Sequence, residues 1–161
     1  MKRADITIAV NGRATRASVE VRTTLVDFLR DELRLTGTHV GCEHGVCGAC
    51  SVLFDGSPVR ACLMFAPQAA GHEITTVEGL CKPDGSPGIL QDSFQEEHGM
   101  QCGYCTPGML ISAQALLNAN PAPTREDIRE AIGANLCRCT GYVQIVESIA
   151  TAAERLRKGG A

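Results

Sequence analysis

The sequence is rich in cysteine, and this is the first feature that could carry chemistry. Nine of its 161 residues are cysteine, and no secretory signal precedes them. Without a signal, closely spaced cysteines indicate thiolates that hold metal rather than a disulfide framework. Because the number is odd, we expect eight ligands and one cysteine, Cys81, outside both sets.

The first set of cysteines lies in the N-terminal half with the spacing C-x4-C-x2-C, followed by a distant fourth cysteine. Its members are Cys42, Cys47, Cys50 and Cys62. This is the spacing of plant-type [2Fe–2S] proteins. Three thiolates on one glycine-rich loop would hold one side of the cluster, and a fourth on a neighbouring strand would close it. A four-cysteine zinc site is the alternative, but zinc ligands usually come as two C-x2-4-C pairs.

The second set of cysteines lies in the C-terminal half as two close pairs. Its members are Cys102, Cys105, Cys137 and Cys139. Helix ends could bring both pairs together inside a small helical bundle. The spacing alone fits zinc as well as a [2Fe–2S] cluster, and both alternatives stay open at this point.

Other reactive residues give weaker signals. Cys81 is expected to be a small buried hydrophobic residue near a linker. His44 lies inside the first ligand loop, but all four cysteines are present, so we expect it on the surface. Arg138 is either a solvated charge or a contact to a partner chain. No nucleophile–base set appears, and we therefore predict no catalytic residue in this chain.

The elements that must position these cysteines change in type near residue 80. Extended segments are expected at residues 5–10, 17–21, 52–54, 59–62 and 73–77. Asn11-Gly12 and Asp55-Gly56 are hairpin-turn signals, and Thr24 is a helix-capping signal with Asp27. Residues 82–88 are almost all turn formers. We therefore expect a domain at 1–80 with strands around one helix, a linker at 81–88 and a helical domain at 89–161.

The helical domain is expected to contain four helices. They are a short one through residues 90–94, one capped by Thr106 that ends before residue 120, one capped by Thr124, and one over about 143–156. Apolar residues at helical spacing support each of them. The whole chain is therefore predicted to have an α+β fold.

Composition excludes several classes of protein. The net charge is −3 and neither half is basic, which argues against nucleic-acid binding. The longest apolar run, residues 61–66, is too short to span a bilayer. The N-terminus leads into alternating residues and not into a signal-peptide core. We therefore expect a cytoplasmic protein, with export on a partner's signal left open.

Four stretches together resemble the small iron–sulfur subunit of the molybdenum hydroxylases, the xanthine dehydrogenase and aldehyde oxidase family. They are GCEHGVCGACSVLFDG, TTVEGL, QCGYCTPGML and NLCRCTGYVQIV, and they cover roughly residues 4–155 in family order. The resemblance implies a β-grasp, plant-ferredoxin-like domain followed by a four-helix domain. It also implies a [2Fe–2S] cluster in each domain, including the second set of cysteines.

The resemblance also implies roles for particular residues and for partner chains. The first set of cysteines would hold the cluster further from molybdenum, and the second set the nearer one. Gln101 and Cys139 would contact the molybdenum–pterin cofactor, which belongs to a large partner subunit. A medium subunit with FAD is expected as well, which gives a heterotrimer whose dimerisation is left open. The flavin and molybdenum domains are not expected to be fused to this chain.

The function implied is electron transfer, one electron at a time, from the molybdenum–pterin centre through two clusters to FAD or another acceptor. The chain would thus be an oxidoreductase subunit without a substrate site of its own. The first alternative is a free two-cluster ferredoxin, and the second is a zinc-stabilised adaptor without a redox role. The substrate of the complex is not encoded in this chain.

Overall fold

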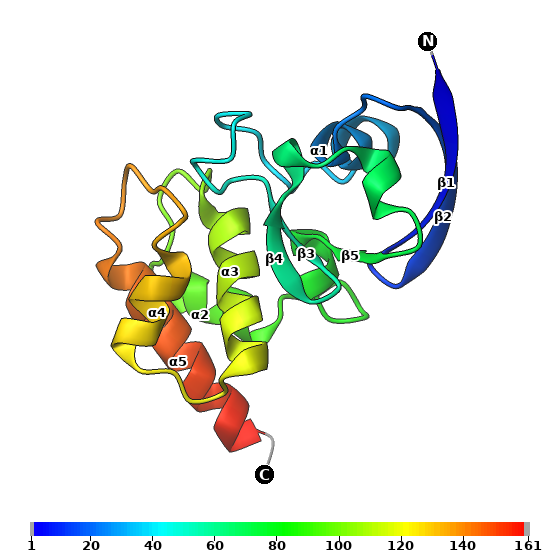
Figure 1. Ribbon diagram of the computed structural model, residues 1–161. Helices are drawn as coiled ribbons and strands as arrows, with labels where there is room; N and C mark the ends of the chain where they lie inside the picture. The colour runs from blue at the N-terminus through cyan, green and yellow to red at the C-terminus, as the bar shows by residue number, and fades with distance from the viewer. Residues whose placement is uncertain (1, 160–161) are drawn as a thin grey trace.

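The computed structural model describes residues 2–159, and its N-terminal half is built on a five-stranded mixed sheet (Figure 1). The strand order is β2-β1-β5-β3-β4. The strands are β1 (Arg3–Val10), β2 (Arg13–Glu20), β3 (Ser51–Phe54), β4 (Ser57–Arg60) and β5 (Glu73–Thr75). β1 pairs with β5 in parallel, and every other neighbouring pair is antiparallel.

Two tight turns set the register of the two hairpins. Asn11 and Gly12 both have positive φ, 50° and 75°, and they join β1 to β2. Asp55 and Gly56, with φ of 47° and 83°, join β3 to β4 in the same way. Positive φ at both central residues is the requirement of the two-residue turn that matches strand twist. The two hairpin predictions are therefore confirmed.

A short helical segment packs on the sheet and completes the N-terminal core. It consists of α1 (Leu25–Asp27) and a π-helical turn, η1 (Phe28–Glu32). The hydroxyl of Thr24 accepts the Asp27 N–H at 3.2 Å, as the capping signal predicts. Leu25, Phe28 and Leu29 are fully buried against the strands. The sequence predicted an ordinary helix here, and its widening into a π-turn was not expected.

Two of the expected strands end earlier than predicted. The segment at 59–62 was expected to be extended, but β4 ends at Arg60 and Cys62 lies in a 3-10 turn, η2 (Ala61–Leu63). Likewise β5 ends at Thr75, and Val77 begins another 3-10 turn, η4 (Val77–Leu80). A further turn, η3 (Ala66–Ala69), lies between them. The fourth cysteine of the first set is therefore presented by a turn and not by a strand.

The C-terminal half is helical, as predicted. Its helices are α2 (Ile89–Glu96), α3 (Thr106–Ala119), α4 (Arg125–Ile132) and α5 (Val143–Gly159). They share a separate core, whose fully buried members include Phe94, Met109, Ile128, Ile145 and Ile149. Thr124 caps α4 as expected, whereas α3 begins at Thr106 itself, so that Thr106 lies inside the helix rather than at its cap. Within residues 2–159 no helix is long and apolar enough to cross a bilayer.

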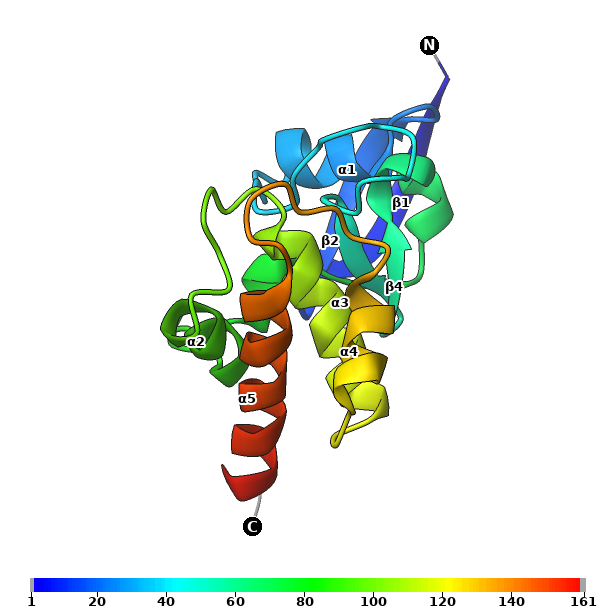
Figure 2. The ribbon, with the colours of Figure 1, turned by 90° about the vertical axis from the view of Figure 1, so that its left-hand side faces the viewer.

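The two halves meet where α3 lies against β3 and β4 (Figure 2). Gly108, in the first turn of α3, faces the backbone of Gly48, and a Cβ at Gly108 would lie 2.2 Å from the Gly48 carbonyl oxygen. Only glycine permits this approach, because a methyl group at that distance would overlap the oxygen. The close packing of the halves therefore depends on a residue without a side chain.

We predict that Gly108→Ala destabilises the folded chain by about 1–3 kcal/mol, the usual cost of overpacking. Inside an α-helix, alanine is normally more stabilising than glycine. A loss of stability in Gly108→Ala would therefore report the contact with Gly48. Gly159→Ala in α5 is the control, since nothing lies within 4 Å of its Cβ position. Thermal unfolding followed by circular dichroism compares the two variants; equal midpoints would contradict the proposed contact.

Candidate metal centres

The N-terminal thiol group, Cys42, Cys47, Cys50 and Cys62, is assembled by the loop that precedes β3 and by the turn η2. The loop folds back on itself through positive φ at Gly45 and Gly48, 82° and 76°. The thiols form two pairs. The Cys47 N–H donates to the Cys42 sulfur at 3.4 Å and the two side chains also interact, while the Cys50 side chain hydrogen-bonds that of Cys62.

The C-terminal thiol group, Cys102, Cys105, Cys137 and Cys139, forms between the turn before α3 and the loop that joins α4 to α5. It is also made of two pairs. The Cys102 and Cys139 sulfurs lie 3.5 Å apart, and the Cys105 side chain hydrogen-bonds that of Cys137. Each pair takes one cysteine from each segment, which is a pairing that the sequence order does not reveal.

The pairwise arrangement fits a two-iron centre. A [2Fe–2S] cluster is held by four cysteine thiolates, two on each iron, whereas a structural zinc ion gathers four ligands around one point. Among residues 2–159, no group of three or more histidine, cysteine or acidic side chains closes around a single ion. The four pairs that the structure forms fall within the two expected sets of four cysteines.

Hydrogen bonds and burial shift the pKa values of the thiols in opposite directions. Backbone N–H groups of Cys47 and His44 lower the pKa of Cys42 to about 6. Burial raises the pKa of Cys50 to about 11 and that of Cys105 to about 12. Metals bind the deprotonated thiolate, so Cys42 is the readier ligand, whereas Cys50 and Cys105 lose their protons only as the metal binds.

Three buried polar atoms without a hydrogen-bond partner lie close in sequence to the thiols. They are the Thr38 hydroxyl, the Thr106 hydroxyl and the Asn135 amide nitrogen. Thr106 follows Cys105 directly, and Asn135 precedes Cys137 by two residues. Buried donors are normally satisfied, so each of these marks a place where an acceptor is expected.

The other residues that the sequence singled out are exposed, except Cys81, which is half-buried. Gln101 is exposed beside Cys102, and Cys139 is exposed as well, so both are accessible to a partner. Arg138 and His44 are exposed, the latter with its ring against the Cys42 carbonyl. Cys81 lies apart from both thiol groups and is half-buried, not fully buried as expected. The Gln91 amide contacts its sulfur at 3.4 Å.

Two residues near the C-terminal thiol group were missed by the sequence reasoning. The Tyr142 hydroxyl accepts the Cys137 N–H at 2.8 Å, and the Thr140 N–H lies 3.4 Å from the Cys137 sulfur. For Cys137 burial raises the pKa, but hydrogen bonds from Thr140 outweigh it and the pKa falls. Both residues belong to the NLCRCTGYVQIV stretch, in which the sequence assigned no role to Thr140 or Tyr142.

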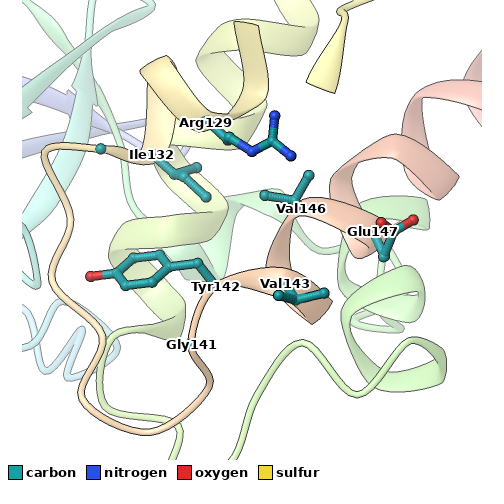
Figure 3. Close-up of a pocket in the computed structure, with 8 residues that line it drawn as sticks. Arg129, Ile132, Gly141, Tyr142, Val143, Val146 and Glu147 are labelled. Carbon is teal, nitrogen blue, oxygen red and sulfur yellow. The ribbon is translucent and has the colours of Figure 1, made fainter. Parts of the chain in front are cut away.

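A cavity of about 350 Å³ lies between α4 and the start of α5 (Figure 3). Its lining includes Arg129, Ile132, Tyr142, Val146 and Glu147, and no cysteine. None of the predicted site residues lines it. This cavity is therefore separate from the thiol groups. Tyr142 lines the cavity and also accepts the Cys137 N–H.

Comparison with protein families divides the chain at the same place as its cores. Residues 8–75 match the 2Fe-2S iron-sulfur cluster binding domain, and residues 76–150 match the [2Fe-2S] binding domain. Each matched region contains one of the two thiol groups.

Individual relatives are similar over nearly the whole chain. The caffeine dehydrogenase subunit gamma of Pseudomonas sp. (strain CBB1) is 57% identical, over 89% of this chain and 87% of that protein. The nicotine 6-hydroxylase small subunit of Paenarthrobacter nicotinovorans is 52% identical, over 91% of this chain and 88% of that protein. Among solved structures, quinoline 2-oxidoreductase from Pseudomonas putida 86 superposes with a TM-score of 0.93 and 47% identity, covering all of both chains.

We predict that Cys81→Ser leaves the metal content of the chain unchanged, because Cys81 lies outside both thiol groups. Cys62→Ser is the matched change inside a group, and it should lower the metal content by the share of one centre. Metal analysis of both purified variants measures this. Loss of metal in Cys81→Ser would mean that the nine cysteines are partitioned differently.

Proposed function

The chain belongs to the family of small iron–sulfur subunits of the molybdenum hydroxylases, and we propose that each thiol group holds one [2Fe–2S] cluster. The proposed ligands are Cys42, Cys47, Cys50 and Cys62 for the first cluster, and Cys102, Cys105, Cys137 and Cys139 for the second. The observation that carries this proposal is the arrangement of each thiol group as two pairs, one pair for each iron.

The function is electron transfer within an oxidoreductase complex. The two clusters held by these cysteines would supply one-electron sites between a molybdenum–pterin centre in a large partner subunit and FAD or another acceptor. The residues of this chain supply the hydrogen-bond donors around the cluster ligands. Cys47 and His44 direct backbone N–H groups at Cys42, and Thr140 does so at Cys137, which stabilises the negative charge that accompanies reduction.

We propose that the exposed edge of the C-terminal thiol group faces the pterin. Gln101 and Cys139 both lie on this edge, and the Cys139 sulfur touches that of Cys102. Gln101 offers two N–H donors and an acceptor, which can fix the orientation of a heterocycle. A ligand cysteine at the contact shortens the path for an electron. The helical cluster would then be the first to receive electrons.

The N-terminal thiol group, further along the same path, would pass electrons to a flavin subunit with FAD or to an external acceptor. A heterotrimer of large, medium and small chains is the assembly that we propose. A free ferredoxin is not favoured, because the relatives are subunits of multi-chain enzymes. The relatives named for caffeine and nicotine also suggest that N-heterocycles are substrates of the complex, bound by the large subunit.

We also propose a functional division of the chain at residues 81–88. The turn-rich segment would separate a ferredoxin-like domain at 1–80 from a cluster-binding helical domain at 89–161. A cytoplasmic location is proposed as well. Nine free thiols are compatible with a reducing compartment, where thiolates remain available to iron.

We predict that the purified chain binds about four iron atoms and four acid-labile sulfides, two of each per cluster. Chemical reduction should then give two different EPR signals, because one cluster lies beside a sheet and the other among helices. Elemental analysis and EPR of the same sample check both results. Stoichiometric zinc in a colourless protein would instead support the adaptor alternative.

We predict that Gln101→Ala slows the arrival of electrons at the helical cluster or weakens retention of the pterin. Iron content and the EPR signal of the N-terminal cluster should stay unchanged, since Gln101 is remote from that thiol group in sequence. Gln95→Ala, an exposed glutamine on α2, is the matched control. Rapid-freeze EPR of both variants, assembled with their partner subunits and mixed with substrate, measures the rates. Equal rates and equal pterin content would contradict the proposed edge.

A further inference from the structure

The two thiol groups are joined by a polar junction that centres on Arg60. This residue ends β4, two positions before Cys62. Its guanidinium reaches across to the helical half, where it donates to the Ala134 carbonyl at 2.6 Å and to the Asn135 side-chain oxygen at 3.2 Å. It also donates to the Ser51 hydroxyl on the adjacent strand. One side chain therefore bonds to both halves at once.

Each acceptor of Arg60 lies within three residues of a proposed cluster ligand. Ser51 follows Cys50, and its hydroxyl donates to the Gly48 carbonyl at 2.6 Å, which braces the N-terminal loop. On the other side, the residue after Asn135 is Leu136, whose N–H donates to the Cys47 carbonyl at 2.9 Å. Cys47 is a ligand of one cluster, and Leu136 precedes a ligand of the other.

Packing leaves this junction little freedom on the helical side. Asn135 is 1% exposed, and its side-chain oxygen accepts from Arg60 and, at 3.3 Å, from the Ser112 hydroxyl. A Cβ at Gly48 would lie 2.6 Å from that oxygen. Without Arg60, two acceptors would lose a charged donor, and a charge-assisted hydrogen bond is stronger than a neutral one. The backbone hydrogen bond from Leu136 to Cys47 would then be the main remaining polar contact between the two loops.

In both ribbon views, three loops gather at one end of the molecule (Figures 1 and 2). They are the loop at 41–50 in cyan, the loop at 100–105 in yellow-green and the loop at 133–142 in orange. Two of them supply the residues that the Arg60 junction connects. A change in the junction therefore acts on the spacing of the two thiol groups.

We propose that Arg60 is a positioning residue that fixes the distance and orientation between the two [2Fe–2S] clusters. The guanidinium is a planar fork that can serve acceptors on both halves, which a single ammonium does less well. This inference rests on the proposed function, since it requires a cluster in each thiol group. It assigns to Arg60 no contact with a cluster, a substrate or a partner chain.

The test is the magnetic interaction between the two reduced clusters in the iron-loaded full chain. This interaction falls with the cube of the distance between the spins, so it reports spacing rather than iron content. In Arg60→Gln we expect full iron content and a smaller or more heterogeneous splitting of the EPR lines. Arg60→Lys should recover part of the splitting. Arg157→Gln, which removes the same charge from the exposed end of α5, should match the unchanged protein.

A second measurement serves if Arg60→Gln loads iron poorly. Hydrogen exchange of the peptide that contains Leu136 should become faster in this variant. The hydrogen bond from the Leu136 N–H to the Cys47 carbonyl oxygen would then open more often, because Arg60 no longer holds the neighbouring residues in place. Unchanged splitting, or unchanged exchange in a poorly loaded variant, would overturn the role of Arg60. Zinc or no metal in the unchanged protein would instead overturn the proposed function, so that the two failures are distinguishable.

Discussion

The structure depends on bringing eight thiolates together as four pairs, at two places in one small chain. Thiolates repel one another and burial adds to that cost, so they are held only where backbone N–H groups and metal offset both. Cys42 receives such donors from its own loop, whereas burial raises the pKa of Cys50 and of the half-buried Cys105, which resist deprotonation. The fold therefore presents ligands of unequal acidity, and metal binding becomes part of the stability of the folded chain.

The contact between the two halves follows from the same requirement. Electron transfer between clusters needs a short and constant separation, and here the backbone of one ligand loop is bonded directly to the other through Leu136 and Cys47. Gly48 and Gly108 permit the approach, since a side chain on either would overlap the opposite half. Each half has its own hydrophobic core. With the proposed ligands, the junction between the cores would set the distance between the metal centres.

Exposure differs between the two pairs of the C-terminal thiol group. Cys102 and Cys139 are exposed, whereas Cys105 and Cys137 are half-buried among the helices. One iron of this centre would therefore lie towards a partner and the other towards the interior. Gln101 lies on the exposed side. In the proposed function this asymmetry would give the centre a direction, with electrons entering at the partner surface and leaving towards the N-terminal half.

The sequence by itself determined the two hairpins and the helical character of the second half, and it predicted the two sets of four cysteines. These features rest on local signals, such as Asn11-Gly12 for a turn or the spacing of three cysteines on one loop. Tertiary structure decided the pairing of thiols, the π-turn after α1, the place of Cys62 in a turn and the reach of Arg60 to Ala134. Such features depend on contacts between residues far apart in the chain. Local propensity carries no information about those contacts, because only the packing of the two halves brings the residues together.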